Sequence, residues 1–372
     1  MKQRRNKHDR NIPQKVPKKK FKVLKIILLI LVFLIIVIIT AISIYAYRNM
    51  NYDKKPLQRT YKAGYIEKQA VLEDGTKLNY AEGPKNGPPL LLIHGQSMKW
   101  EDYARVLPEL SKYYHVYAID CHGHGKSSHN SSKYTGVAMG QDFVWFIKNV
   151  IGEPCVISGH SSGGILAAWV AANAPDLVSG LVLEDPPFFS VEPHEMQNTF
   201  VWFESFVTVH NFITQNAEED YVVYYLENSY LWGKFGELKS LIANSAKKYR
   251  TKHPGEPLKL WYVPYSWMHG TLYLDSFDLA FSEYFYNGSW FEGLNQEEIL
   301  SKINVPSVYI KAATQYGEDG VLYAANSDED AGKVHELIKE NEMITIHSGH
   351  DIHFEHPDKF IQVMVDFLDR IQ

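Results

Sequence analysis

Residues 154–164 of this chain read PCVISGHSSGG. A short apolar run, residues 155–157, leads into the pattern G-x-S-x-G, and a helix-favouring stretch follows over residues 165–173. A strand, a tight turn and a helix in this order present the hydroxyl of Ser161 on a strained turn. The first turn of the helix also favours developing negative charge beside that hydroxyl. The segment therefore predicts a nucleophilic serine.

Two glycines and two backbone N–H groups complete this prediction. Gly159 and Gly163 lack a Cβ where the strand and the helix crowd the turn. Acyl transfer needs two N–H donors for the oxyanion, one directly after the nucleophile and one from the loop after an upstream strand. Ser162 follows the nucleophile, and Gln96 follows the apolar run 89–93. We therefore expect Ser162 and Gln96 to form the oxyanion hole.

Several histidines compete for the role of general base. A last strand is predicted over residues 343–346, and His350, His353 and His356 all follow it within a short stretch. A base must reach the hydroxyl of Ser161 at hydrogen-bond distance, which spacing alone does not measure. Upstream, His94 is expected to brace its loop rather than to take part in the chemistry. No set of Cys, His or acidic residues at metal-ligand spacing accompanies His122 and His124, so a structural role in their loop is expected for them.

Together these motifs resemble the α/β-hydrolase superfamily over roughly residues 65–372. The resemblance rests on His94-Gly95, on Asp120-Cys121-His122-Gly123-His124-Gly125-Lys126-Ser127, on Gly159-His160-Ser161-Ser162-Gly163-Gly164, and on Gly349-His350 with Glu355 and Pro357. It implies an α/β fold with a mostly parallel eight-stranded sheet, helices on both faces and a helical cap. The offsets of Glu355 and Pro357 select His350 as the base. A serine at position 161 disfavours the epoxide hydrolases and haloalkane dehalogenases, whose nucleophile is Asp.

The catalytic acid is the open point of this resemblance. The family places it shortly beyond the strand predicted at 307–311, where this chain has Gln315. Asp319 is our first choice, since its separation from His350 is close to the one usual in the family. Asp185, which ends the strand 181–184, is the second choice, as some relatives carry their acid there. Asp328 and Glu318 are the remaining candidates.

An aromatic insertion separates the two parts of the predicted core, residues 65–185 and 301–372. Residues 188–292 hold 26 Phe, Trp and Tyr in 105 positions. In the resembling family this place, here residues 186–300, holds a helical cap over the site. We expect most of these aromatic residues to form the core of the cap and the others to line an acyl or aromatic pocket.

The N-terminus predicts a membrane anchor. Residues 26–47 carry no charged side chain. At about 1.5 Å per residue, a helix of this length spans the hydrocarbon core of a bilayer, which is roughly 30 Å thick. Residues 1–25 carry eleven Lys and Arg against one acid, which predicts a cytoplasmic N-terminus and an extracytoplasmic body. Residues 48–64 are expected to form a polar stalk.

Charge and cysteine content exclude other classes. Residues 1–25 carry a net charge of +10 and the rest of the chain −15, which disfavours a nucleic-acid enzyme. Cys121 and Cys155 lie on or after strands that the family's sheet order separates by another strand, about 10 Å apart, so two free thiols are expected. No cofactor or metal is expected, because triad chemistry needs only water.

These inferences lead to a membrane-anchored serine hydrolase that cleaves a carboxylic ester, lipid ester or thioester. Ser161, His350 and Asp319 would form its triad, and a small acyl compound would be its substrate. An aminopeptidase-like enzyme or a C–C bond hydrolase is an alternative on the same fold. The aminopeptidase would need an acid in the cap, and Glu204, Glu218, Glu219 and Glu227 are available. A non-catalytic binding protein is the alternative from another class.

Overall fold

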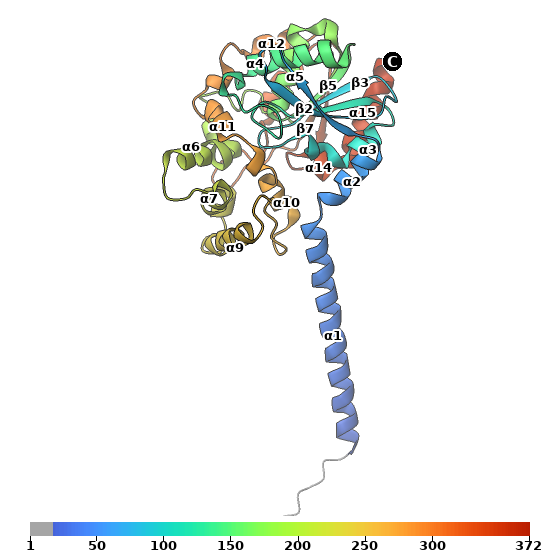
Figure 1. Ribbon diagram of the computed structural model, residues 1–372, viewed down its shortest axis with the longest axis vertical. Coiled ribbons are helices and arrows are strands. Elements are labelled where there is room, and N and C mark those ends of the chain that lie inside the picture. Colours follow the sequence, from blue (N-terminus) through green and yellow to red (C-terminus); the bar gives the residue numbers. More distant parts are fainter. Residues whose placement is uncertain (1–17) are drawn as a thin grey trace, which may run out of the picture.

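The computed structural model describes residues 18–372, with side chains from residue 21. Most of the expected basic tail, residues 1–25, therefore lies outside the described residues. A long helix, α1 (Lys18–Met50), projects from a body that contains a sheet, its flanking helices and a helical insertion (Figure 1).

An eight-stranded sheet forms the centre of the body, in the order β1-β2-β4-β3-β5-β6-β7-β8. Strands β3 to β8 are parallel, while β2 is antiparallel to both β1 and β4. The strands are β1 (Ile66–Val71), β2 (Lys77–Glu82), β3 (Pro89–Ile93), β4 (His115–Ile119), β5 (Cys155–His160), β6 (Val178–Glu184), β7 (Ser307–Ala312) and β8 (Asn341–Ile346). The fold class expected from the sequence is therefore confirmed.

Successive side chains of the apolar strands point to opposite faces of the sheet, and both faces are buried. In β3, Leu91 and Ile93 pack in the core on one face, and Leu90 and Leu92 pack in the core on the other. The first face is covered by α4 (Gly136–Phe146), α5 (Ser162–Asn173), α12 (Gln296–Lys302) and α13 (Asp328–Leu337). The second is covered by α3 (Leu107–Leu110), α14 (Ile352–Glu355) and α15 (Pro357–Ile371).

The insertion between β6 and β7 is helical. Its helices are α6 (Val207–Thr214), α7 (Tyr221–Asn228), α8 (Tyr230–Gly233), α9 (Leu238–Lys252), α10 (Tyr265–Met268) and α11 (Leu279–Tyr286). Of its 26 aromatic residues only Trp261, Tyr262, Tyr265 and Trp267 are exposed. The others are buried or half-buried, as expected for residues that form a small core or line a pocket. α12 packs on α5 and α13, so it belongs to the core layer although the predicted cap extended to residue 300.

The prediction of a polar stalk over residues 48–64 is wrong for residues 49–62. Residues 54–62 form the helix α2 (Lys54–Lys62), which packs on α3 and on the 3-10 helix η1 (Trp100–Arg105). Asn49, Tyr52 and Thr60 are buried. The sequence looked polar because α2 exposes its cations, while its few apolar and small residues face the body.

Cys121 and Cys155 are free and buried. Strand β3 lies between β4 and β5, as predicted. This spacing explains why the two thiols do not pair.

Candidate active site

The turn between β5 and α5 holds Ser161 in a strained backbone conformation. Its φ is +55° and its ψ is −126°, and its N–H donates to the carbonyl of Glu184 at 3.0 Å. A Cβ on Gly159 would lie 2.1 Å from the carbonyl oxygen of Gly163, and one on Gly163 would lie 2.4 Å from the carbonyl oxygen of Ile93. Only glycine fits at these two positions, as predicted from the sequence. The strain is characteristic of a functional turn.

The loop after β3 holds the second predicted oxyanion donor, Gln96. His124 braces this loop, because its Nε2 accepts from the N–H of Ser97 at 3.1 Å, where φ is +61°. Within residues 18–372 no hydrogen-bond partner is found for the backbone N–H of Gln96 or of Ser162. Both groups are therefore available to stabilise an oxyanion.

His94 has the structural role expected of it. Its Nε2 accepts from the N–H of Cys121 at 3.0 Å, and its Nδ1 donates to the carbonyl of Gly95 at 2.7 Å. Burial lowers the pKa of His94, which keeps the ring neutral for these two bonds. His122 likewise binds Asp142 at 2.9 Å, away from any reacting group.

The structure places Asp185, and not Asp319, against His350. His350 Nδ1 lies 2.7 Å from Asp185 Oδ2, and Asp185 Oδ1 accepts from the N–H of Ala312 at 2.9 Å. Asp185 is fully buried at the carboxyl end of β6. The loop before His350 is held by Glu355, whose Oε2 accepts from the N–H of Gly349 at 2.7 Å.

Asp319 and Asp328 lie elsewhere, which corrects the first choice for the acid. Asp319 is bound by the hydroxyl of Tyr230 and by Lys234 of the cap. Asp328 lies 3.1 Å from Lys311 and is exposed at the start of α13. The loop after β7 runs outward to the cap, so its carboxylates do not reach His350. The signal for the second choice was present, because Asp185 directly follows a buried strand beside the nucleophile strand.

Two opposing effects set the pKa of His350. Burial lowers it, but the hydrogen bond to Asp185 and the charges of Asp185 and Asp351 outweigh the burial, and the pKa lies above its ordinary value. The neighbouring His160 shows the opposite result. Burial and the nearby His350 lower the pKa of His160 to about 3, so it stays neutral.

A buried charge network lies behind the site, and no pattern in the sequence indicated it. Both ring nitrogens of His353 bind carboxylates, Nδ1 to Glu184 at 2.9 Å and Nε2 to Asp102 at 3.0 Å. Asp102 also binds His269 of the cap at 2.7 Å. Burial lowers the pKa of His353, but the two carboxylates raise it far more.

The position of His353 excludes two roles for it. Held between two carboxylates, it is no rival to His350 as the base. His353 lies close to Asp102 and His160, and these three residues are of types that can ligate a metal ion. However, both ring nitrogens of the His353 imidazolium carry a proton and donate to carboxylates, so the ring has no lone pair for a metal ion.

Comparison with known proteins assigns the chain to a family. Residues 88–357 match the model of the alpha/beta hydrolase fold. The chain belongs to the α/β hydrolase family. It is 35% identical to the serine hydrolase-like protein of Homo sapiens over 126 residues, which are 33% of this chain and 61% of that protein. The match spans 40% of the human serine hydrolase-like protein 2, so the chain spans about half the length of these curated relatives.

Solved structures share the fold of this hydrolase. A membrane phospholipase A, described as a bacterial virulence factor, is similar with a TM-score of 0.54 at 20% identity, covering 93% of this chain and 99% of that one. The enol-lactonase of Burkholderia xenovorans is similar with a TM-score of 0.56 at 17% identity, covering 81% and 100%. At this identity the likeness concerns the fold.

A cavity of about 360 Å³ brings the site of the hydrolase together with its cap. Ser161 and His350 line it from the core, together with Gln96 and Ser162. The cap contributes mainly aromatic side chains, namely Phe200, Phe206, Tyr221, Tyr225, Phe277 and Phe285. Such a lining suits an acyl chain or an aromatic group.

Glu204 is the one acid of the cap that lines this cavity. It is buried, and it accepts from Ser229 at 3.1 Å, from the N–H of Leu231 at 2.7 Å and from the hydroxyl of Tyr225. Burial raises its pKa, although these donors partly oppose the rise. Its oxygens therefore hold cap helices together rather than pointing unpaired into the cavity.

Proposed function

We propose that this hydrolase is a serine enzyme that cleaves carboxylic esters, lipid esters or thioesters through an acyl-enzyme. One observation carries the proposal: a strained serine and a histidine held by a buried aspartate line the same cavity as two residues with unpartnered backbone N–H groups. This combination matches what acyl transfer requires of a protein.

In this mechanism Ser161 Oγ attacks the carbonyl carbon while His350 Nε2 takes its proton. Asp185 accepts the Nδ1–H bond, which fixes the tautomer and stabilises the imidazolium that forms. The N–H groups of Gln96 and Ser162 hold the oxyanion. His350 then returns the proton to the leaving group, and water, activated by the same histidine, releases the acid.

Two alternatives lose support in the light of these contacts. A non-catalytic binding protein was suggested by the missing acid after β7, but Asp185 supplies a carboxylate at His350. An aminopeptidase needs a free acid to bind the substrate amine, and the hydrogen-bonding oxygens of Glu204 are already engaged within the cap.

Labelling with a fluorophosphonate probe tests the proposal on the full chain in detergent. We expect labelling of the wild type, no labelling of Ser161→Ala, and full labelling of Ser301→Ala, whose serine is exposed on α12. A series of p-nitrophenyl esters from short to long would then measure the acyl pocket. A folded wild type that neither labels nor turns over these esters would contradict the mechanism.

We further propose that α1 anchors the enzyme in the cell membrane, with the N-terminus in the cytoplasm and the body outside. α1 is long and apolar enough to cross a bilayer, and its apolar side chains are exposed. Protease added to intact cells should degrade the body. Its survival until the cells are permeabilised would reverse the orientation.

A further inference from the structure

The last turn of α1 is bound directly to the cap. Asn49 is buried, and its Nδ2 donates to the carbonyl oxygens of Leu260 at 3.1 Å, Trp261 at 3.2 Å and Val263. Its Oδ1 accepts from the N–H of Tyr265 at 2.7 Å. One side chain thus ties the end of the apolar helix to the backbone of the cap segment 260–265.

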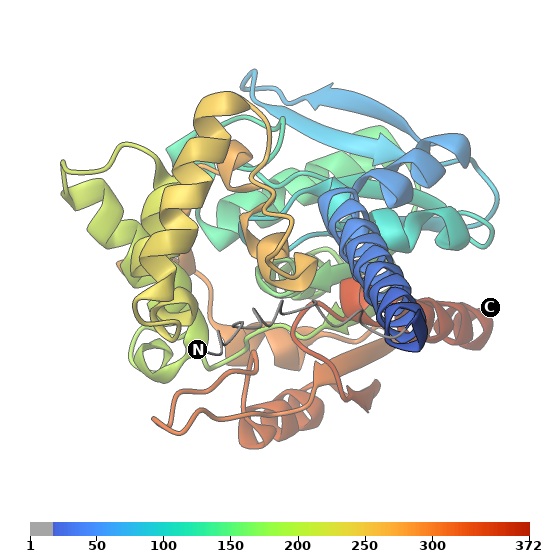
Figure 2. The ribbon, with the colours of Figure 1, turned by 90° about the horizontal axis from the view of Figure 1, so that it is seen from below.

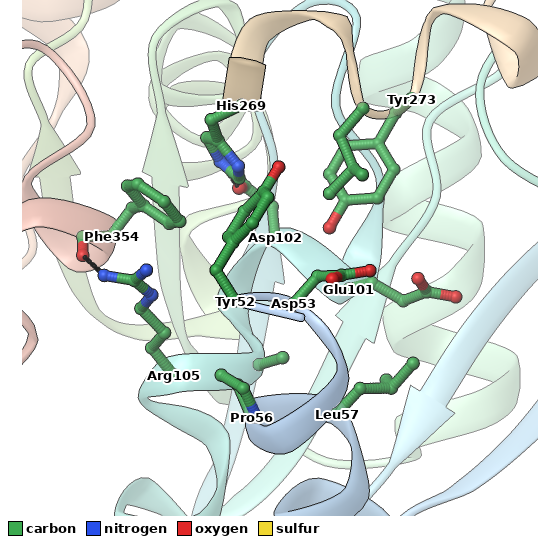
Figure 3. Close-up of a pocket in the computed structure, with 12 residues that line it drawn as sticks. Tyr52, Asp53, Pro56, Leu57, Glu101, Asp102, Arg105, His269, Tyr273 and Phe354 are labelled. Atoms are coloured by element: carbon green, nitrogen blue, oxygen red, sulfur yellow. Dashed lines mark hydrogen bonds and ion pairs between the residues drawn. The ribbon is translucent and has the colours of Figure 1, made fainter. Parts of the chain in front are cut away.

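A second set of contacts holds the same junction to the cap and to the core. The ring of Tyr52 stacks on that of Tyr265, with the ring centroids 5.1 Å apart. Figure 3 shows the ring of Tyr52 beside Phe354 of α14, against which it packs edge-on. Asp53 pairs with Lys259 at 2.7 Å. The body is therefore held at a defined height and tilt on α1, instead of hanging from a flexible stalk.

This junction sets the depth of the cap relative to a bilayer. The uncharged run of α1 ends at Tyr47, and Asn49 lies about 3 Å further along the helix. The polar headgroup layer on each side of the hydrocarbon core is roughly 5–7 Å thick. Because the backbone of Trp261 hydrogen bonds to Asn49, the segment around Trp261 lies at the depth of the headgroups.

The side chains at this depth are those that favour a membrane interface. Trp261, Tyr262, Tyr265 and Trp267 are the four exposed aromatic residues of the insertion, and Leu238 and Leu241 on α9 are exposed beside Trp267 and Tyr262, with which they line one surface groove. α9 and α10 lie on the side of the body from which α1 leaves (Figure 1), and Figure 2 views this side along α1. Trp and Tyr are enriched at the headgroup level because their rings are amphipathic.

On the other side of the junction the surface is basic. α2 exposes Lys54, Lys55, Arg59 and Lys62, and these line a groove with the end of α1. No ion pair involves any of the four within residues 21–372. Cations at headgroup depth attract lipid phosphates.

We propose that the body rests on the membrane through this surface, defined by Trp261, Tyr262, Trp267, Leu238 and Leu241 of the cap together with the cations of α2. Its occupant is the phospholipid headgroup layer of the leaflet in which α1 ends. The inference rests on the proposed membrane anchoring by α1. It does not depend on the proposed ester chemistry.

Site-directed spin labelling of the full chain in phosphatidylcholine–phosphatidylglycerol vesicles tests this surface. Nitroxides are attached to Trp261→Cys and Trp267→Cys, and to Ser301→Cys on α12 at the opposite end of the body as the matched control. Cys121 and Cys155 are buried, and the unsubstituted protein serves as the labelling blank. Power saturation with oxygen, which partitions into lipid, and with a water-soluble nickel chelate then reports the surroundings of each label.

We expect the ratio of oxygen to nickel accessibility to be several-fold higher at 261 and 267 than at 301. A ratio equal to that at 301 would place the surface in water and overturn the proposal. Protection from both reagents would mean that a second copy of the protein covers it, and would also overturn the proposal. If the chain is not retained by vesicles after alkaline washing, the anchor fails and this proposal with it, while probe labelling of Ser161 would still report on the hydrolase.

Discussion

At the residue scale the proposed mechanism depends on one contact, between His350 Nδ1 and Asp185 Oδ2 at 2.7 Å. Asp185 is buried and also bonds the backbone at the end of β7, so it has no freedom to leave the histidine. Asp319, by contrast, is bound to cap residues at the surface. Substituting each of these two aspartates therefore compares the acid bound to His350 with an acid at the surface of the protein.

Asp185→Asn should reduce kcat/KM for an activated ester by about 10⁴-fold, since an amide favours the wrong tautomer of the histidine. Asp319→Asn should leave kcat/KM within about twofold, because it changes only a surface contact. Steady-state kinetics of both variants, with folding checked by circular dichroism, measure the difference. Equal losses in the two variants would show that Asp185 does not serve the triad.

The pH profile reports the same contact through the pKa of His350. A general base works only when neutral, and the pKa of His350 is raised, so kcat/KM should rise through an acid limb centred above the ordinary histidine value of about 6.5. The negative charge of Asp351 contributes to the raised pKa of His350, and the carboxylate of Asp351 lies 3.3 Å from Nε2 of His160. Asp351→Asn should therefore move the limb to lower pH and leave the plateau at high pH intact. A limb that does not move, or moves upward, would contradict the assignment of the base.

At the element scale the site depends on how closely β5 approaches α5. The approach leaves no space for a Cβ atom at Gly159, and it holds Ser161 at a strained, positive φ. Neighbouring strand ends then supply the other groups of the proposed mechanism: the loop after β3 carries Gln96 of the proposed oxyanion hole, and the end of β6 carries Asp185, the proposed acid. The sheet order thus gathers residues that the chain keeps apart.

Gly159→Ala should lower the free energy of unfolding by about 3 kcal/mol or more, since its Cβ would meet rigid backbone at 2.1 Å. Gly332→Ala is the matched control, because Gly332 lies within α13 with nothing near the added Cβ. It should raise stability by about 0.5–1 kcal/mol through helix propensity. Denaturation followed by tryptophan fluorescence measures both. A neutral Gly159→Ala would mean that the turn relaxes more easily than its geometry indicates.

At the scale of the whole molecule the notable feature is the junction between α1, the cap and the core. Asn49, Tyr52 and Asp53 each contact cap residues. The same part of the cap contributes Gly270, shortly after Trp267, to the wall of the catalytic cavity. The proposed membrane anchor, the proposed interfacial surface and the pocket wall are therefore joined through one short segment of the cap.

Asn49→Ala should loosen this junction, because the carbonyls of Trp261 and Val263 and the N–H of Tyr265 lose their hydrogen-bond partner, while the carbonyl of Leu260 still accepts from the N–H of Val263. The cost is about 1–3 kcal/mol for a buried unsatisfied group. Hydrogen exchange by mass spectrometry should show faster exchange in the segment 259–266. Asn51→Ala is the control, since the side chain of Asn51 bonds only the carbonyl of Tyr47 one turn earlier. Unchanged exchange in Asn49→Ala would mean that Tyr52 and Asp53 hold the junction alone.

The sequence by itself determined the elbow at Ser161, the two glycines it needs and the apolar span of α1, because each depends on local turn chemistry or on a continuous hydrophobic pattern. The fold class followed from the resemblance that the motifs carry. Only the tertiary structure decided the partner of His350, because Asp185 is distant in the sequence and becomes its neighbour where the strands of the sheet end at one edge. The same holds for His353 between Glu184 and Asp102, and for the docking of residues 49–62 on the body. These contacts join distant segments, and no spacing along the chain encodes which of several carboxylates or polar stretches folding will bring together.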